Sequence, residues 1–74
     1  MEGIIKLLQE GIVNFIYKKK DGSIRKAIGT LKDMNVKFKK PDTIPYFDIE
    51  KNAFRSFKLD NLKEVNGKKI KRGK

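Results

Sequence analysis

A regular alternation of apolar and polar residues near the C-terminus is the feature that most restricts the fold of this chain. Along Ala53–Leu59, a period of two places Phe57 on one face of a strand and Phe54 on the other. A second short strand begins at Tyr46, and the polar turn at 50–52 joins the two. The stretch therefore predicts a β-hairpin, for which the rest of the chain must supply a partner sheet and a cover.

Further short strands are predicted on both sides of this hairpin. Ile12–Lys19 is rich in β-branched and aromatic residues and leads to Asp21-Gly22, a strong signal for a hairpin turn. The return strand covers Ser23–Leu31 and contains Gly29, which indicates a bulge or a sharp bend. Close approach of a ligand to Gly29 is the alternative. Three further short elements are expected: a strand at 35–39, a helical or 3₁₀ turn at 59–62 and a last strand at 63–65.

The N-terminal segment has the pattern of a short amphipathic helix. Glu2–Glu10 places Ile4, Leu7 and Leu8 at helical spacing, and Gly11 stands where the helix is expected to end. A helix of about three turns is not stable alone in water. We therefore expect it to cover an open end of a barrel, with a membrane-surface or partner-binding helix as the alternative.

One short helix followed by about five short strands predicts a mainly β fold. In a chain of 74 residues, the simplest architecture is a five-stranded, SH3-like barrel with a thin core. We expect a single domain over residues 1–67. Residues 68–74 are predicted to be a basic, disordered tail.

The strong positive charge restricts the classes of partner. Nineteen Lys and Arg residues against nine Asp and Glu residues give a net charge of +10. Residues 68–74 hold five of the positive charges, so residues 1–67 are basic without them. Such a charge favours nucleic acid, an acidic protein surface or anionic lipid, although solubility alone is an alternative explanation.

The composition argues against several kinds of chemistry. The sequence contains no His and no Cys, which removes the commonest general base and any thiolate metal site. No spacing of carboxylates or serines indicates catalysis, so we expect no enzyme activity, no cofactor and no metal. No apolar run is long enough to span a bilayer, and no signal peptide is evident. We expect a cytoplasmic protein.

Two stretches resemble known families. Phe47-Asp48-Ile49-Glu50, followed by Phe54-Arg55-Ser56-Phe57-Lys58-Leu59-Asp60-Asn61-Leu62, resembles the end of WYL domains, where a Tyr-Asp-Leu-Glu hairpin leads into Trp-Arg-Thr-Phe-Arg-Leu-Asp-Arg-Ile. The chain is more specifically similar to the small stand-alone WYL-related family of phages and Bacteroides-type bacteria, which implies an Sm-like SH3 β-barrel. The order of residues in Asp21-Gly22 and Gly29-Thr30-Leu31-Lys32-Asp33-Met34-Asn35 is also similar to the first Sm motif, with different spacings.

The chain departs from the WYL pattern at positions that line a presumed ligand pocket in that family. Asp42-Thr43-Ile44 stands near the place of the Trp-Tyr-Leu triplet, Phe54 replaces a Trp, and Asn61 replaces the final Arg. The resemblance therefore supports the barrel more strongly than the sensing of a small ligand.

Basic side chains interleaved with aromatic ones form the candidate binding site. Barrels of this kind bind single strands by stacking bases on aromatic rings while cations follow the phosphates. Tyr17, Tyr46 and Phe54 are the candidates for stacking, with burial in the core as the alternative. Arg55 binds either a phosphate or an acidic residue across the hairpin, Asp48 or Glu50. The predicted nucleic-acid-binding residues are Lys18, Lys19, Lys20, Arg25, Lys26, Lys37, Lys39, Lys40, Tyr46, Phe54, Arg55, Lys58, Lys68, Lys69, Lys71 and Arg72.

Three functions remain open from the sequence. The leading hypothesis is a non-enzymatic nucleic-acid-binding or transcription-associated accessory domain of a phage or mobile element, which favours single strands. The alternatives are a protein-interaction module that docks on an acidic host protein, and a barrel that senses a nucleotide or oligonucleotide. We expect a monomer or a small homo-oligomer, for which the strand at 63–65 or the strand after Pro45 could supply an exposed edge.

Overall fold

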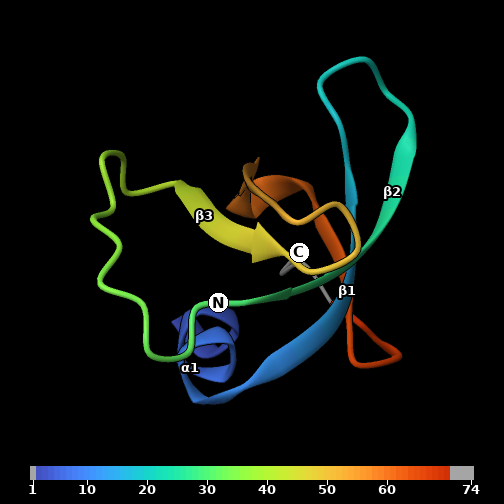
Figure 1. Ribbon diagram of the computed structural model, residues 1–74. Helices are drawn as coiled ribbons and strands as arrows, with labels where there is room; N and C mark the ends of the chain where they lie inside the picture. Colours follow the sequence, from blue (N-terminus) through green and yellow to red (C-terminus); the bar gives the residue numbers. More distant parts are fainter. Residues whose placement is uncertain (1, 71–74) are drawn as a thin grey trace.

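The computed structural model describes residues 2–70, in which one helix precedes an antiparallel sheet that curls around a single core (Figure 1). The sheet order is β4-β3-β2-β1-β5-β6. The mainly β class with a short N-terminal helix is confirmed, although the sheet has six strands rather than five. In chain order the elements are α1 (Glu2–Glu10), β1 (Ile12–Lys18), β2 (Ile24–Thr30), β3 (Thr43–Asp48), β4 (Ala53–Lys58), the 3₁₀ helix η1 (Leu59–Asn61), β5 (Leu62–Val65) and β6 (Lys68–Lys69).

Helix α1 lies at the end of the sheet opposite the β1–β2 turn (Figure 1). Its Ile4 and Leu8 side chains are buried in the core. The backbone N–H of Leu31 donates a 2.8 Å hydrogen bond to the carbonyl of Leu8, and the hydroxyl of Thr30 donates a 2.7 Å bond to the carbonyl of Gly11. These contacts attach α1 to the end of β2, as expected of a lid.

Four aromatic rings form the centre of the core. The ring centroid of Phe15 lies 4.9 Å from that of Tyr46 and 5.2 Å from that of Phe57. The Tyr17 ring lies 5.1 Å from Phe57. Side chains two residues apart share a face of a strand, so the alternation in β1 directs both Phe15 and Tyr17 inward. The cluster joins β1, β3 and β4 into one core.

Gly29 lies in a regularly paired part of β2 rather than at a bulge. It pairs in register with β1 and with Asp48 of β3. A Cβ atom at this position would lie 2.5 Å from Cδ2 of Tyr46, so the glycine makes room for that ring. A register shift occurs instead where β1 pairs with β5, between Ile16 and Tyr17, because β5 carries the extra residue Lys63 there. The bulge prediction was wrong because a bulge and a close ring contact favour glycine equally.

Residues 31–42 form an irregular connection between β2 and β3, and residues 35–39 of this described segment do not form the predicted strand. Val36 packs against the core, whereas Phe38 is more than a third exposed. The apolar alternation here therefore marks one anchored side chain in a loop rather than a strand. We call residues 31–42 the long loop.

The C-terminal segment continues the sheet beyond the predicted end of the domain. Asn66 and Gly67 have φ values of 50° and 83°, which form a tight turn. Lys68 and Lys69 then pair with β5 as strand β6. The first residues of the predicted disordered tail therefore belong to the sheet, and residues 71–74 of that tail lie outside the described residues.

The edges of the sheet also differ from the expectation. Strand β5 is covered by β6, and β3 pairs with β4 along its whole length. The edge strands of the described sheet are therefore β4 and β6, rather than 63–65 or the strand that contains Pro45.

Candidate functional site

An open groove with a volume of about 930 Å³ is bordered by the β1–β2 turn, the long loop and the β3–β4 hairpin. The turn and the loop project on opposite sides of β3 (Figure 1). Asn61 of η1 also lines the groove. Ten predicted binding residues line this groove: Lys18, Lys19, Lys20, Arg25, Lys37, Lys39, Lys40, Phe54, Arg55 and Lys58.

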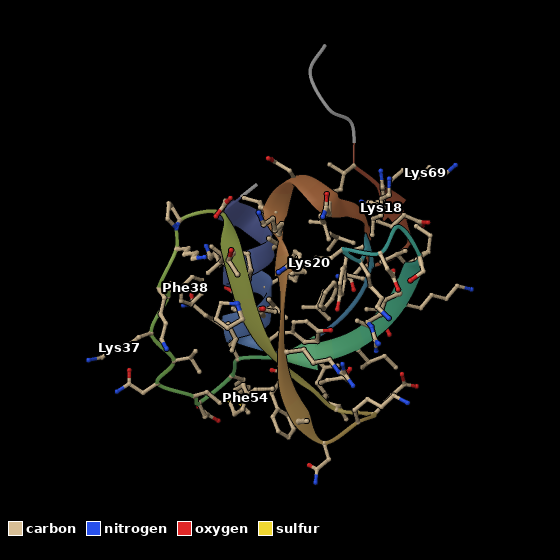
Figure 2. The ribbon with its side chains drawn as sticks, turned by 90° about the horizontal axis from the view of Figure 1, so that it is seen from above. Lys18, Lys20, Lys37, Phe38, Phe54 and Lys69 are labelled. Carbon is tan, nitrogen blue, oxygen red and sulfur yellow. The ribbon has the colours of Figure 1, made fainter. Side chains whose placement is uncertain are left out.

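The charge of the groove is of one sign. Nine of the described residues that line it are Lys or Arg, and none of them is Asp or Glu. Lys18 and Lys37 lie on opposite sides of the view in Figure 2, with Lys20 between them. The positive charge is therefore spread across the groove rather than gathered at one point. Such a surface attracts a polyanion, and the attraction weakens as salt is added.

The β1–β2 turn, which carries the first three lysines, is held by local hydrogen bonds. The Asp21 carboxylate accepts a 2.9 Å bond from the backbone N–H of Ser23 and a 2.6 Å bond from its hydroxyl. The bond from the Ser23 hydroxyl is the main cause that lowers the pKa of Asp21 below its usual value. Gly22 has a φ of 92°, a conformation that favours glycine. The hairpin predicted from Asp21-Gly22 is confirmed.

Two arginines and one buried carboxylate meet between β2, β3 and β4. Oδ2 of Asp48 lies 3.2 Å from Nε of Arg55 and 4.0 Å from Nη1 of Arg25. The contact with Arg55 is an ion pair that lacks the alignment of a hydrogen bond. Oδ1 of Asp48 accepts a 3.0 Å bond from the backbone N–H of Lys51. Of the two alternatives for Arg55, the pair with Asp48 is observed, while the arginine also lines the groove.

The three aromatic candidates differ in exposure. Phe54 is 58% exposed, and its ring packs edge-on against Phe47 with centroids 5.2 Å apart. Tyr46 is fully buried and Tyr17 nearly so, with their hydroxyl oxygens 2.9 Å apart. Burial and this hydrogen bond raise the pKa of Tyr46 well above its usual value. The prediction of Tyr46 as an exposed binding residue was wrong, because tyrosine is amphipathic and suits both settings.

The other predicted residues lie outside the groove. Lys26 lines a separate hollow of about 310 Å³ together with Glu50 and Glu64, whose charges oppose its own. Lys68 and Lys69 are exposed on β6. Lys71 and Arg72 lie outside the described residues.

Several groove residues were not among the predicted binding residues. They are Val36, Thr43, Pro45, Ser56, Phe57 and Asn61, and the stacking candidate Tyr17 also lines the groove. Pro45 and Ser56 are cross-strand partners, and the alternation that exposes Phe54 also places Ser56 on the outer face. That pattern could have identified these positions, whereas the position of Val36 depends on how the long loop packs.

Over residues 2–70, no cluster of three or more acidic, His or Cys side chains is arranged to hold a metal ion. The one helix in this part of the chain is neither long enough nor apolar enough to cross a membrane.

Comparison with known proteins places the chain in a family. The sequence model of the family WYL_2, described as having a Sm-like SH3 beta-barrel fold, matches residues 1–63. The chain is also 34% identical, over 76 aligned residues, to the uncharacterized 11.5 kDa protein in the Gp31-cd intergenic region of Enterobacteria phage T4. That alignment covers 85% of this chain and 74% of the phage protein. No solved structure matches the chain. With a family match over most of its length, a barrel of the same class and a similar phage protein, the chain belongs to the WYL_2 family.

Proposed function

We propose that this protein is a non-enzymatic nucleic-acid-binding accessory domain that prefers single strands and acts in the cytoplasm of a host cell. The observation that carries the proposal is the groove, which nine Lys and Arg residues and no acidic residue, among those described, line together with an exposed aromatic ring. The similar phage T4 protein supports a phage or mobile-element origin. Residues of the groove bind and orient the strand, and none is assigned a catalytic role.

The form of the groove favours a phosphate backbone as the ligand. Lysines line one continuous hollow from three separate elements, which are the β1–β2 turn, the long loop and β4. A chain of phosphates is the polyanion whose charges repeat along such a length. Phosphate contacts of this kind position the nucleic-acid strand in the groove and require no recognition of individual bases.

The exposed ring favours a single strand over a duplex. Phe54 remains 58% exposed although it packs against Phe47, so one ring face or edge stays free for a ligand. Bases of a single strand can stack on such a ring, whereas paired bases in a duplex are stacked on one another. Phe54 therefore stacks with a base, and the lysines contact the phosphates around it.

The proposal is tested by fluorescence-anisotropy titration of labelled single-stranded DNA, single-stranded RNA and duplex at two salt concentrations. With about four phosphates in contact, the affinity for a single strand falls about 50-fold between about 50 and 200 mM salt. Phe54→Ala weakens binding by about 1–3 kcal/mol, the usual contribution of a stacked base. Ile24→Ala is the matched control, because Ile24 is equally exposed at 57% and does not line the groove.

A truncated variant tests whether the groove or residues 71–74 bind the strand. Removal of residues 71–74 leaves β6 intact, whereas removal from Lys68 onward would also delete a strand. The shorter protein retains its preference for single strands if the groove is the site. Binding that is insensitive to salt, or that is lost when only residues 71–74 are removed, would contradict the proposal. In that case an acidic protein becomes the better candidate partner for the same charge.

A further inference from the structure

The groove contains one place where two arginines form ion pairs with the same buried carboxylate. Arg25 comes from β2 and Arg55 from β4, and both contact the same oxygen atom of Asp48. The side chain of Asp48 is 3% exposed, whereas those of Arg25 and Arg55 are 20% and 36% exposed. Two positive charges thus share one negative charge, and one positive charge is left without a partner.

The two arginines retain hydrogen-bond donors that can serve a ligand. A guanidinium group has five N–H donors, and the contacts with Asp48 involve Nε of Arg55 and Nη1 of Arg25. Both side chains line the groove, where no described residue is acidic. The remaining donors therefore meet a surface that offers no carboxylate to accept them.

We propose that Arg25 and Arg55 together bind one phosphate group of the nucleic-acid strand, with Asp48 as the positioning residue that holds both. This inference rests on the proposed function and names the contact that sets the register of the strand. Planar guanidinium groups match the oxygens of a phosphate with paired hydrogen bonds, whereas lysine acts as a point charge. The two groove arginines thus provide one geometrically defined phosphate site among seven lysines that supply diffuse attraction.

The position of this site relates it to the stacking ring. Arg55 follows Phe54 directly in β4, which is an edge strand of the sheet. Consecutive residues of a strand point to opposite faces. A nucleic-acid strand that passes over the edge of β4 therefore meets the phosphate site on one side and the aromatic ring on the other.

The sharpest test of this proposal is the sign of the effect of Asp48→Asn. This change removes one negative charge beside the groove, so attraction of a polyanion by charge alone would tighten binding. If Asp48 positions the arginines, binding of a labelled single strand weakens instead, by about fivefold or more. Asp60→Asn is the control, because Asp60 is exposed on η1 and its replacement changes the net charge equally without touching either arginine. Circular dichroism establishes that both variants fold.

Charge-conserving substitutions test the arginines themselves. Arg25→Lys and Arg55→Lys keep the charge and remove the fork of donors, so each weakens single-strand binding about tenfold. A second measurement uses inorganic phosphate as the probe and follows the Nε–Hε resonances of the arginine side chains by NMR. The sequence has three arginines, so Arg72 serves as the internal control. Phosphate shifts the resonances of Arg25 and Arg55 and leaves that of Arg72 in place.

The outcomes separate this inference from the proposed function. Single-strand binding that is unchanged in both lysine variants and tighter in Asp48→Asn overturns the phosphate site and leaves the nucleic-acid function standing. Absence of strand binding by the wild type, with selective phosphate shifts at Arg25 and Arg55, overturns the nucleic-acid function and supports an anion site. Absence of both overturns both. Loss of binding in all three variants together with selective shifts supports the inference.

Discussion

Replacement of Gly29 by alanine tests the packing that defines the barrel interior. The new Cβ would lie 2.5 Å from Cδ2 of Tyr46 and 3.2 Å from the backbone oxygen of Phe47. The Tyr46 ring cannot move aside freely, because it is fully buried and its hydroxyl pairs with that of Tyr17. The backbone of β2 at this position is also held between β1 and β3. The added methyl group therefore forces strain into a well-packed region.

The size of the effect follows from this crowding. Overpacking of a core destabilises a protein by about 1–3 kcal/mol. A folded chain of this length has a stability of about 4–11 kcal/mol, so Gly29→Ala remains folded at 25 °C. In a domain of this size, 1 kcal/mol corresponds to about 4–8 °C. A loss of about 2 kcal/mol therefore lowers Tm by about 10 °C.

Urea unfolding followed by far-UV circular dichroism measures the change, because the chain has no tryptophan to report by fluorescence. The midpoint falls while the m-value stays constant, since the surface exposed on unfolding is unchanged. Gly11→Ala is the control, because a Cβ atom there would have no heavy atom within 4 Å in the described structure other than those of its own residue and its two chain neighbours. A Gly29→Ala protein with the wild-type midpoint would refute the close ring contact as the reason for this glycine.

Two further predictions concern the buried tyrosine pair and the groove lysines. Tyr46→Phe removes a buried hydrogen bond and lowers stability by about 1 kcal/mol in urea titrations at neutral pH. Because burial raises the pKa of Tyr46 above its usual 10.0, the unfolded chain loses this proton first as the pH rises. Stability of the wild type therefore declines above about pH 10, and a pH series in which Tyr46→Phe declines as steeply would contradict this assignment. Lys39→Ala lowers the slope of log affinity against log salt by the amount that corresponds to about one phosphate contact. Lys26→Ala changes the charge equally but lies outside the groove, so it leaves this slope unchanged.

The hairpins were predictable from the sequence because their signals are local. Asp21-Gly22 provides the turn residues, and the alternation in Ala53–Leu59 correctly separates buried Phe57 from exposed Phe54. Asn66-Gly67 carries the same kind of turn signal, but only two residues follow it in β6. So short a strand has no periodicity to detect, and the turn was interpreted as the end of the domain.

The groove could be predicted only as a set of charges, because its geometry depends on contacts between distant segments. Its lysines come from positions 18–20, 37, 39, 40 and 58, which the fold brings to one hollow. In the sequence Lys26 cannot be told apart from these lysines, yet it lines a separate hollow together with Glu50 and Glu64. The burial of Tyr46 could not be predicted for a related reason, because its hydroxyl partner, Tyr17, lies 29 residues away in the chain.

The β3–β4 hairpin explains how one short segment can serve both the core and the site. Its inward positions, such as Ile44 and Phe57, are buried, while outward positions such as Phe54 and Ser56 remain exposed. Truncation of a side chain on the outward face removes little apolar surface from the core, so the change in folding free energy is small. Loss of strand binding in Phe54→Ala can therefore be attributed to the lost contact rather than to unfolding. Arg55 is the exception, because it lies on the inner face and contacts buried Asp48. For that reason lysine, which keeps the charge beside Asp48, is a more informative replacement at this position than alanine.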